Sequence, residues 1–498
     1  MFGLPNNNEM VSISDLTRLN DAIRKATPGF AGYQTPAQMG DGSLSPLATQ
    51  SIEANLATAT FTSKHLTLWQ KLTKTSANNF IHEYTSVLEN GLDTNPFIAE
   101  GEGGSDSLGT NQSVYERKFV KIKFMAERRQ VSDMASMLSF NIGANANALA
   151  EETERGTLTL LKKIEKALWF GDEDVNPEGF DGIIKQIERT SGAIVDGQGR
   201  PYRSNTWDLE GKAPTVLLLQ EILGEVYGSP NYGEPDTIYV TPAIYAELQK
   251  QFNEQGRYDI SISGNSIVAG VKSISVMAPY GLVDIVSAPF LERSEKPNAI
   301  EAVGHGIVAS FSTQPTAAAD ASSKSKFKAA DAGFYKYAVV AVNKLGMTLP
   351  IISNAVQVSA GDKVSMKIAR NGGNPAISYR IYRTAKAVSA EAVNLDSLKF
   401  IMEVSASQLE GNTFADYNHF MYGCSHIVFA NHDPGQMAFA KLMDFMRKDL
   451  AQVSTTRPFL LMLFGSLMVK TPNKFWVVRN AGVNNASGVA ANYLNANF

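Results

Sequence analysis

Alternating apolar and polar positions predict two strands early in the chain. β-prone residues alternate with polar ones from 81 to 88 and again from 114 to 125. In the second stretch, Val120, Ile122 and Phe124 interleave with polar residues at the period of a half-buried strand. The connecting segment 91–112 is rich in glycine, so we predict a two-stranded ribbon with a long flexible tip. Two strands alone cannot form a hydrophobic core, so such a ribbon has to pack on another surface to be stable.

A helical period follows the ribbon and predicts one long helix. Ser132-Asp133 offers an N-cap, and a helical period then follows through Leu149, Thr153, Leu160, Leu161, Ile164 and Leu168. We expect about 25 helical residues before Gly171-Asp172 ends the helix. Gly156 interrupts this pattern and predicts a bend. The acidic residues of the helix, Glu151, Glu152 and Glu165, are expected on a solvated or partner-facing side.

The remaining patterns predict an α+β region interrupted by an all-β one. Residues 183–290 predict helices at 215–227 and 242–253, a strand at 237–240 and strands within 270–287. From 296 to 420, short runs of Val, Tyr, Ile, Ser and Thr between turn clusters such as 371–375 predict a small β-sandwich. After 421 we expect a helix at 436–450 and strands at 459–464, 467–469 and 475–478. The sandwich is therefore interpreted as an insertion into a discontinuous domain.

Residues 1–60 predict an extended arm with one short helix at 14–25, and the tail from 480 is expected to be loose.

Composition narrows the class of protein. The 498 residues include 19% charged and 44% hydrophobic residues, which excludes disorder by composition. The formal net charge of −4 argues against a basic surface that binds nucleic acid. One cysteine excludes an internal disulfide, and no apolar run approaches the length of a membrane-spanning helix. The first ten residues lack the pattern of a signal peptide, so an unsecreted, multi-domain protein is expected.

Motifs for catalysis or cofactor binding do not emerge from the chain. The glycine-rich stretches 40–42 and 101–104 neither follow a strand nor open a helix, which a phosphate cradle requires. The patterns GxxxxGK[ST], HExxH, CxxC and GxSxG are missing. We therefore predict no catalytic residues, no cofactor-binding residues and no metal ligands, and a protein that is not an enzyme.

One cluster with metal-ligand chemistry leaves an alternative open. The only cysteine and half of the six histidines lie close together in sequence, with an aspartate beside them: His419, Cys424, His426, His432 and Asp433. The Cys-x-His pair can supply two ligands, but the spacings match no zinc pattern. A boundary between the insertion and its host domain explains these residues as well.

The densest basic stretch consists of Lys121, Lys123, Arg128 and Arg129. Because the chain is acidic overall, we interpret this stretch as a charge partner for an acidic loop of a neighbouring subunit, rather than as a nucleic-acid site.

Short motifs spread in order along the chain resemble the major capsid proteins of tailed bacteriophages, of the Hong Kong ninety-seven type. Residues 165–172 (EKALWFGD) followed by 179–183 (GFDGI) look like that family's spine-helix exit. Val131-Ser132 and the stretch 239–242 (YVTP) fit the same pattern. In the last part of the chain, the matches are 448–451, 458–467, 470–472 and 480–483.

The resemblance implies an α+β tailed-phage capsid fold with an inserted all-β sandwich. Its parts are an N-terminal arm (1–77), an E-loop ribbon (78–131), a peripheral domain with the spine helix (132–182), a first axial part (183–295), the sandwich (296–420) and a return with the C-terminal tail (421–498). It implies self-assembly into hexamers and pentamers of an icosahedral shell around double-stranded DNA. It also implies a virion protein assembled in the host cytoplasm. Leu161→Asp is then expected to abolish shells.

The partners implied are further copies of the chain, a portal, packaged DNA held without sequence specificity, and in some phages a decoration protein. No long charged helical segment precedes the arm, so a separate scaffolding protein is expected. For the crosslink that some members make, Lys118, Lys121 and Lys123 are equal candidates.

The insertion resembles an immunoglobulin or fibronectin type III module. Residues 337–343 look like its F strand, 378–383 like its C strand, and 413–416 like the turn that leads into F. Since the F-like strand comes first, a circular permutation is implied. The sandwich is expected to project outward for decoration, inter-capsomer or host-surface contacts.

Two other interpretations stay open from sequence. One is an encapsulin-like compartment with the same shell fold and no genome. The other is a carbohydrate-active enzyme with a fibronectin module, which needs an acid/base carboxylate pair in an aromatic cleft.

Overall fold

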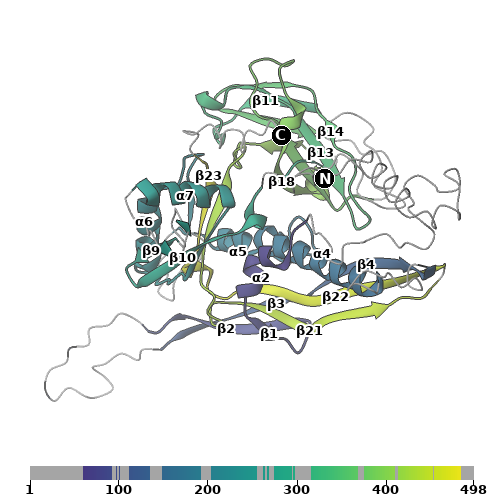
Figure 1. Cartoon of the computed structure of the whole chain (residues 1–498). Helices are drawn as coiled ribbons and strands as arrows, with labels where there is room; N and C mark the ends of the chain where they lie inside the picture. Colours follow the sequence, from purple (N-terminus) through teal and green to yellow (C-terminus); the bar gives the residue numbers. More distant parts are fainter. Residues whose placement is uncertain are drawn as a thin grey trace, which may run out of the picture. The chain divides into compact units, whose positions relative to one another are not determined.

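The computed structural model describes residues 60–91, 97, 100, 112–134, 148–191, 204–254, 262–263, 266–267, 274–293, 295–297, 316–367, 375–409, 413–452 and 454–483 (Figure 1). The chain divides into two units. The first consists of Met1–Ala59 and Met134–Glu151, and the second consists of Thr60–Asp133 and Glu152–Phe498. Apart from residues 134 and 148–151, the described residues all belong to the second unit. The predicted helix at 14–25, most of the ribbon tip, most of the turn at 371–375 and the tail beyond 483 lie outside the described residues.

The ribbon forms as predicted, and its second strand continues into a larger sheet. Strand β2 (Ile81–Glu89) pairs antiparallel with β3 (Val114–Lys121). The predicted strand 114–125 divides at the buried Ile122, where β4 (Lys123–Ser132) begins. Strand β4 joins a sheet with order β1-β21-β22-β4, in which β1 is Lys74–Ser76, β21 is Met437–Asp449 and β22 is Thr456–Val469.

The helix predicted at 436–450 is wrong, because this segment is strand β21. Its Met, Ala, Leu and Lys residues favour a helix locally. In the structure the segment pairs with β22 from Met437 opposite Val469 to Asp449 opposite Phe459. Strand β22 also merges the two strands predicted at 459–464 and 467–469 into one. Long-range pairing and burial of residues 437–440 therefore override local propensity.

The long helix α4 (Ala148–Phe170) runs along this sheet (Figure 1). It buries the row Leu160, Ile164 and Leu168, whereas Leu161 is only half-buried. Gly156 is a point of close approach, and the bend predicted there stays a prediction. A Cβ atom at Gly156 would lie 2.7 Å from Cδ1 of Leu461 on β22, so only glycine lets the helix pack this closely.

A second sheet, with order β5-β23-β20-β6-β10-β9, combines strands from both sides of the predicted insertion. The strands that precede the insertion in sequence are β5 (Thr206–Asp208), β6 (Thr237–Val240), β9 (Ser275–Ala278) and β10 (Gly281–Ser287). The strands that follow the insertion are β20 (Ser425–Ala430) and β23 (Trp476–Ala481). We call the residues on either side of the sandwich, 60–293 and 421–483, the flanking region.

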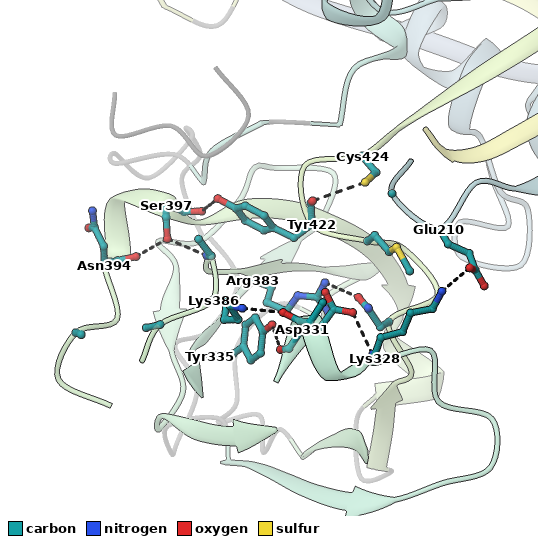
Figure 2. Close-up of a pocket in the computed structure, with 17 residues that line it drawn as sticks. Glu210, Lys328, Asp331, Tyr335, Arg383, Lys386, Asn394, Ser397, Tyr422 and Cys424 are labelled. Atoms are coloured by element: carbon teal, nitrogen blue, oxygen red, sulfur yellow. Dashed lines mark hydrogen bonds and ion pairs between the residues drawn. The ribbon is translucent and has the colours of Figure 1, made fainter. Parts of the chain in front are cut away.

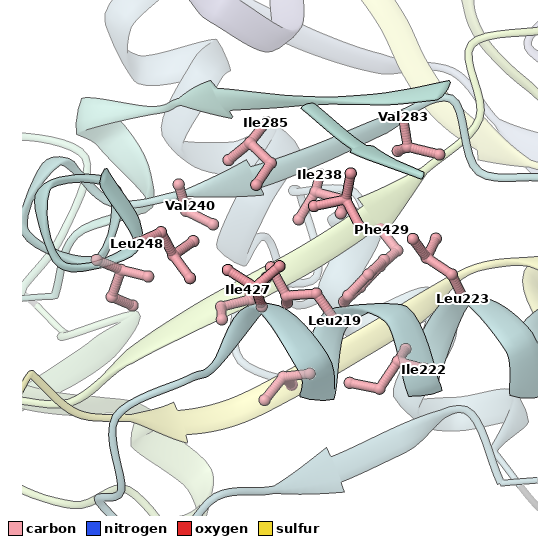
Figure 3. Close-up of a cluster of buried hydrophobic side chains, with 14 of the residues drawn as sticks. Leu219, Ile222, Leu223, Ile238, Val240, Leu248, Val283, Ile285, Ile427 and Phe429 are labelled. Atoms are coloured by element: carbon pink, nitrogen blue, oxygen red, sulfur yellow. The ribbon is translucent and has the colours of Figure 1, made fainter. Parts of the chain in front are cut away.

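Helices α6 (Val216–Tyr227) and α7 (Pro242–Glu254) supply apolar faces to this second sheet. Thr215 caps α6 by accepting a hydrogen bond from the backbone N–H of Leu218. Figure 3 shows Leu219 and Leu223 of α6 with Ile238 and Phe429 of the sheet in one buried cluster. This core holds the discontinuous parts of the flanking region together.

Residues 316–416 form two facing sheets around a core of their own. One sheet has the order β11-β16-β19, with β11 at Thr316–Ala321, β16 at Asp362–Lys367 and β19 at Thr413–Asp416. The other has the order β14-β13-β17-β18, with β14 at Ile351–Ile352, β13 at Tyr337–Val342, β17 at Ser378–Arg383 and β18 at Lys399–Ser405. Side chains of both sheets meet in one cluster, so this part is a β-sandwich.

The immunoglobulin or fibronectin III-like identity of the sandwich stays a prediction. The F-like strand β13 does pair antiparallel with the C-like strand β17, as those strands do in such folds. Residues 413–416, predicted as a turn, are strand β19 instead, because they pair with β16.

Short elements complete the described chain: the helices α2 (Thr67–Lys71), α5 (Ile183–Thr190) and α8 (Ala406–Leu409), and the strands β7 (Ile262–Ser263), β8 (Ser266–Ile267), β12 (Gly333–Tyr335) and β15 (Val356–Val358). Single 3-10 turns occur at Ser63–His65, Pro289–Leu291, Ala329–Asp331, Leu395–Ser397 and Pro472–Lys474. Within the described part of the chain, no helix combines the length and apolarity needed to cross a membrane.

Candidate functional site

The outward face of the β2–β3 ribbon carries a row of exposed apolar side chains. Val87 lies opposite Tyr115, and Glu83 lies opposite Phe119, so alternation places these side chains on one face. Tyr115 is 66% exposed, and Phe119 is 61% exposed. An ion pair between Glu83 and Arg117 (3.5 Å) lies on the same face. Exposed aromatic residues beside a charge pair are typical of a protein–protein contact surface.

Glu165 is buried, which corrects the prediction of a solvated or partner-facing position. Its two carboxylate oxygens accept hydrogen bonds from the backbone N–H groups of Leu68 (2.9 Å) and Trp69 (2.8 Å) in α2. Burial raises the pKa of this carboxyl group, although the two backbone donors oppose the rise. Glu165 therefore anchors the segment before the ribbon to the long helix.

Lysine–carboxylate pairs join the sandwich to the flanking region with a consistent polarity. Lys326 pairs with Asp208, Lys328 with Glu210, and Lys344 with Glu178 at 2.7 Å. In each pair the sandwich supplies the lysine and the flanking region supplies the carboxylate. Pairs this exposed contribute little stability singly, but their polarity fixes the orientation of docking.

A half-buried arginine, whose Nε atom is buried, lies where the sandwich joins the flanking region. The guanidinium of Arg293 lies between the rings of Phe170 at the end of α4 (4.7 Å) and Phe420 after the sandwich (4.2 Å). It also donates to the backbone carbonyl of Ile401 (3.3 Å) in the sandwich. Burial lowers the pKa of Arg293 to about 10, with Arg479 contributing in the same direction. Through this stacking, Arg293 connects the end of α4 with the segments that enter and leave the sandwich.

His426 lies beside this junction, and its environment predicts that the unfolding free energy of the protein depends on pH. Its ring packs 6.0 Å from those of Phe170 and Phe420, and its buried ring nitrogens have no hydrogen-bond partner within the described residues. Burial, then Arg293 and Arg479, hold the pKa of His426 well below its ordinary value.

The unfolded chain therefore takes up a proton at His426 below about pH 6.5 that the folded chain does not. We expect this residue to reduce the unfolding free energy by up to about 1.4 kcal/mol for each pH unit below that value. His426→Leu should remove this part of the slope in urea unfolding measured between neutral and mildly acidic pH. An identical slope in the variant and the natural protein would contradict the assignment.

The candidate metal residues are distributed over separate contacts. His432 pairs through Nδ1 with Asp236 (2.9 Å) and through Nε2 with the hydroxyl of Tyr239 (2.8 Å). His419 contacts Arg479 (3.0 Å), and the Cys424 thiol lies 3.8 Å from the carbonyl of Tyr422. Burial raises the pKa of Cys424 to about 12, which disfavours the thiolate. Within the described residues, no three His, Cys, Asp or Glu side chains form a metal-binding group.

Part of the predicted basic stretch is used inside the chain. Lys123 pairs with Glu173 (2.9 Å), and Arg129 donates to Thr159 (2.9 Å) on α4. These two side chains therefore join strand β4 to helix α4 and to the loop that follows it within the same chain. The prediction of a contact with a neighbouring acidic loop rests on Lys121 and Arg128.

Comparison with known proteins decides the family. A family model described as the SU10 major capsid protein matches residues 43–308, which is more than half of the chain. The chain belongs to this family of major capsid proteins. The putative major capsid protein of Enterococcus phage phiEF24C is 23% identical over 488 residues, which cover 93% of this chain and 96% of that protein.

Solved structures show a distant likeness to this capsid protein. The capsid of a native GTA particle is 9% identical with a TM-score of 0.44, covering 90% of this chain and 99% of that one. The capsid of cyanophage P-SCSP1u is 10% identical with a TM-score of 0.42, covering 92% and 99%. The encapsulin SrpI of Synechococcus elongatus PCC 7942 is 11% identical with a TM-score of 0.38, covering 88% and 94%. The assignment rests on the family match.

The family match confirms the resemblance to phage major capsid proteins, and the described helices and strands confirm the expected α+β class. Sequence reasoning missed Glu165 and Arg383, which the structure buries, and Arg293, which stacks on two aromatic rings distant in sequence. For Glu165 one signal existed, because it falls between the apolar residues Ile164 and Leu168 of the helical pattern. For the two arginines no local pattern reveals these contacts.

Proposed function

We propose that this major capsid protein self-assembles into hexamers and pentamers that close an icosahedral shell around the double-stranded DNA of a tailed phage. Its role is structural rather than catalytic, as part of the virion, after assembly in the host cytoplasm. The outward face of the ribbon carries the proposal. A two-stranded ribbon with exposed Tyr115 and Phe119 is stabilised when a second copy covers it.

The proposed partners follow from the same role. A separate scaffolding protein, a portal and a decoration protein would act with further copies of the chain. The net charge of −4 supports a container that holds DNA without gripping it. We further propose that the sandwich, residues 296–420, projects outward for decoration, inter-capsomer or host-surface contacts.

The test is negative-stain electron microscopy and sedimentation of the expressed chain, alone and together with the proteins encoded beside it. Shells, tubes or rings of six support the proposal, whereas a monomer under every condition contradicts it. Particles that form but exclude DNA when the packaging proteins are present favour the encapsulin-like alternative. The match to a phage capsid family favours the genome container.

A further inference from the structure

A cleft of about 700 Å³ opens where the sandwich meets the loop after β5 (Figure 2). Glu210 and Gly211 contribute from the flanking region, and the sandwich contributes Lys328, Asp331 and Lys386. This volume lies within the range of small-molecule sites. Its position at the junction separates it from the exposed face of the ribbon.

The floor of the cleft is preorganised by buried polar contacts. Arg383 donates to Asp416 (2.8 Å) and Asn418 (2.7 Å), and its guanidinium lies 5.6 Å from the ring of Tyr335. The Tyr422 hydroxyl donates to the carbonyl of Ser397 (2.6 Å). The floor is therefore built before any ligand arrives, which reduces the entropy lost on binding.

Two charged groups at the cleft keep hydrogen-bonding capacity. The Lys386 ammonium donates to the backbone carbonyl of Ala330 (2.7 Å), and the Asp331 carboxylate accepts from the backbone N–H of Lys328 (3.1 Å). Within the described residues neither side chain has an ion-pair partner. An ammonium has three donors and a carboxylate has about four acceptor sites, so both can bind a ligand as they stand.

Three cationic and two anionic side chains line the cleft, and Asp416, outside the lining, supplies a third negative charge beside Arg383. The local charges therefore balance, which favours a neutral ligand. Lys328 pairs with Glu210, Arg383 pairs with Asp416, and Lys386 and Asp331 offset each other. A phosphate or an amine would gain one attraction and meet one repulsion. A polyhydroxylated molecule instead offers a donor and an acceptor at each hydroxyl group. The rings of Tyr335 and Tyr422 provide apolar faces for its C–H groups.

We propose that this cleft binds a neutral saccharide. Donors from Lys328 and Lys386 and acceptors from Asp331 and Glu210 contact its hydroxyl groups. The inference gives the sandwich a ligand class and does not depend on shell assembly, because every residue used lies in one chain.

The test is saturation-transfer NMR on the full-length protein. The probes are glucose, galactose, rhamnose and N-acetylglucosamine, with inorganic phosphate and ethanolamine as charged comparisons. We expect at least one neutral sugar to give a saturable signal and the charged probes to give none. Signals from phosphate or ethanolamine alone, or from no probe, overturn the proposal.

Variants place the signal in the cleft. Lys386→Ala and Asp331→Asn should each weaken sugar binding by at least about tenfold. Ala392→Trp, at an exposed lining position, should abolish it by filling the space. Lys324→Ala changes an exposed lysine of the sandwich outside the lining and should leave binding unchanged. Equal binding by the natural protein and all three cleft variants overturns the proposal, and circular dichroism checks that each variant is folded.

Discussion

Arg383→Met is expected to unfold the sandwich locally while the flanking region stays folded. Arg383 and Asp416 are each 2% exposed, and their ion pair measures 2.8 Å. The Tyr337 hydroxyl donates to the same carboxylate at 3.0 Å. Removing the guanidinium leaves the Asp416 charge buried with two neutral donors, the Tyr337 hydroxyl and the backbone N–H of Asn418 (2.8 Å). Breaking a buried pair from one side costs about 3–5 kcal/mol.

Amide hydrogen exchange locates this effect. Protection of the amides of β13 and β17 should fall by an amount equivalent to about 3–5 kcal/mol, while protection of β22 in the flanking region should hold. Arg380→Met is the matched control, because Arg380 lies on the same strand in a pair with Glu403 whose side chains are 28% and 30% exposed. Its loss should cost about 0–1 kcal/mol.

The double variant Arg383→Met with Asp416→Leu separates loss of attraction from loss of packing. Replacing both charges by apolar groups should recover a large part of the protection, because no charge is then left unpaired. Full protection in the single variant would show that the pair does not stabilise the sandwich.

Much of the fold can be predicted from local patterns because the flanking helices and strands are periodic and clearly bounded. Strand β6 lies at its predicted residues, 237–240, and α6 starts one residue after its predicted start, at the Thr215 cap. The helix prediction for 436–450 is wrong because the helix-forming composition of this segment says nothing about its pairing partner, β22, which comes after it in sequence. Only the three-dimensional ladder reveals that choice.

The contacts of Arg293 at the junction and of Glu165 on the long helix could not be predicted from sequence, for a different reason. Arg293 meets Phe420 across 127 positions, and Glu165 meets Leu68 across 97. Burial of a charge depends on partners brought together by the whole fold, and no local spacing encodes them. The exposed apolar row of the ribbon could be predicted in part, because alternation along a strand predicts two faces. The sequence does not tell which of the two faces packs on the rest of the chain and which stays exposed.

Phe119→Asp combined with Tyr115→Asp is expected to abolish assembly and leave the monomer folded. Both side chains are more than 60% exposed in the single chain, so the aspartates meet water there and cost little. In an assembled shell each ring would contribute about 1.5–3 kcal/mol by burial, and each charge would have to be desolvated. Repetition over every subunit multiplies this loss.

Sedimentation of the variant should therefore show monomers, with a far-ultraviolet circular dichroism spectrum like that of the natural protein. Val388→Asp places the same charge on a side chain of the sandwich that is 90% exposed, and should assemble normally. Phe119→Leu keeps an apolar contact and should also assemble, because the ribbon face acts through burial rather than through a specific ring. Normal shells from the double aspartate variant would contradict the prediction. They would show that subunits contact each other through another surface and that no second copy covers the apolar row of the ribbon. Loss of assembly in Val388→Asp as well would show that the sandwich, not only the ribbon, carries contacts between subunits.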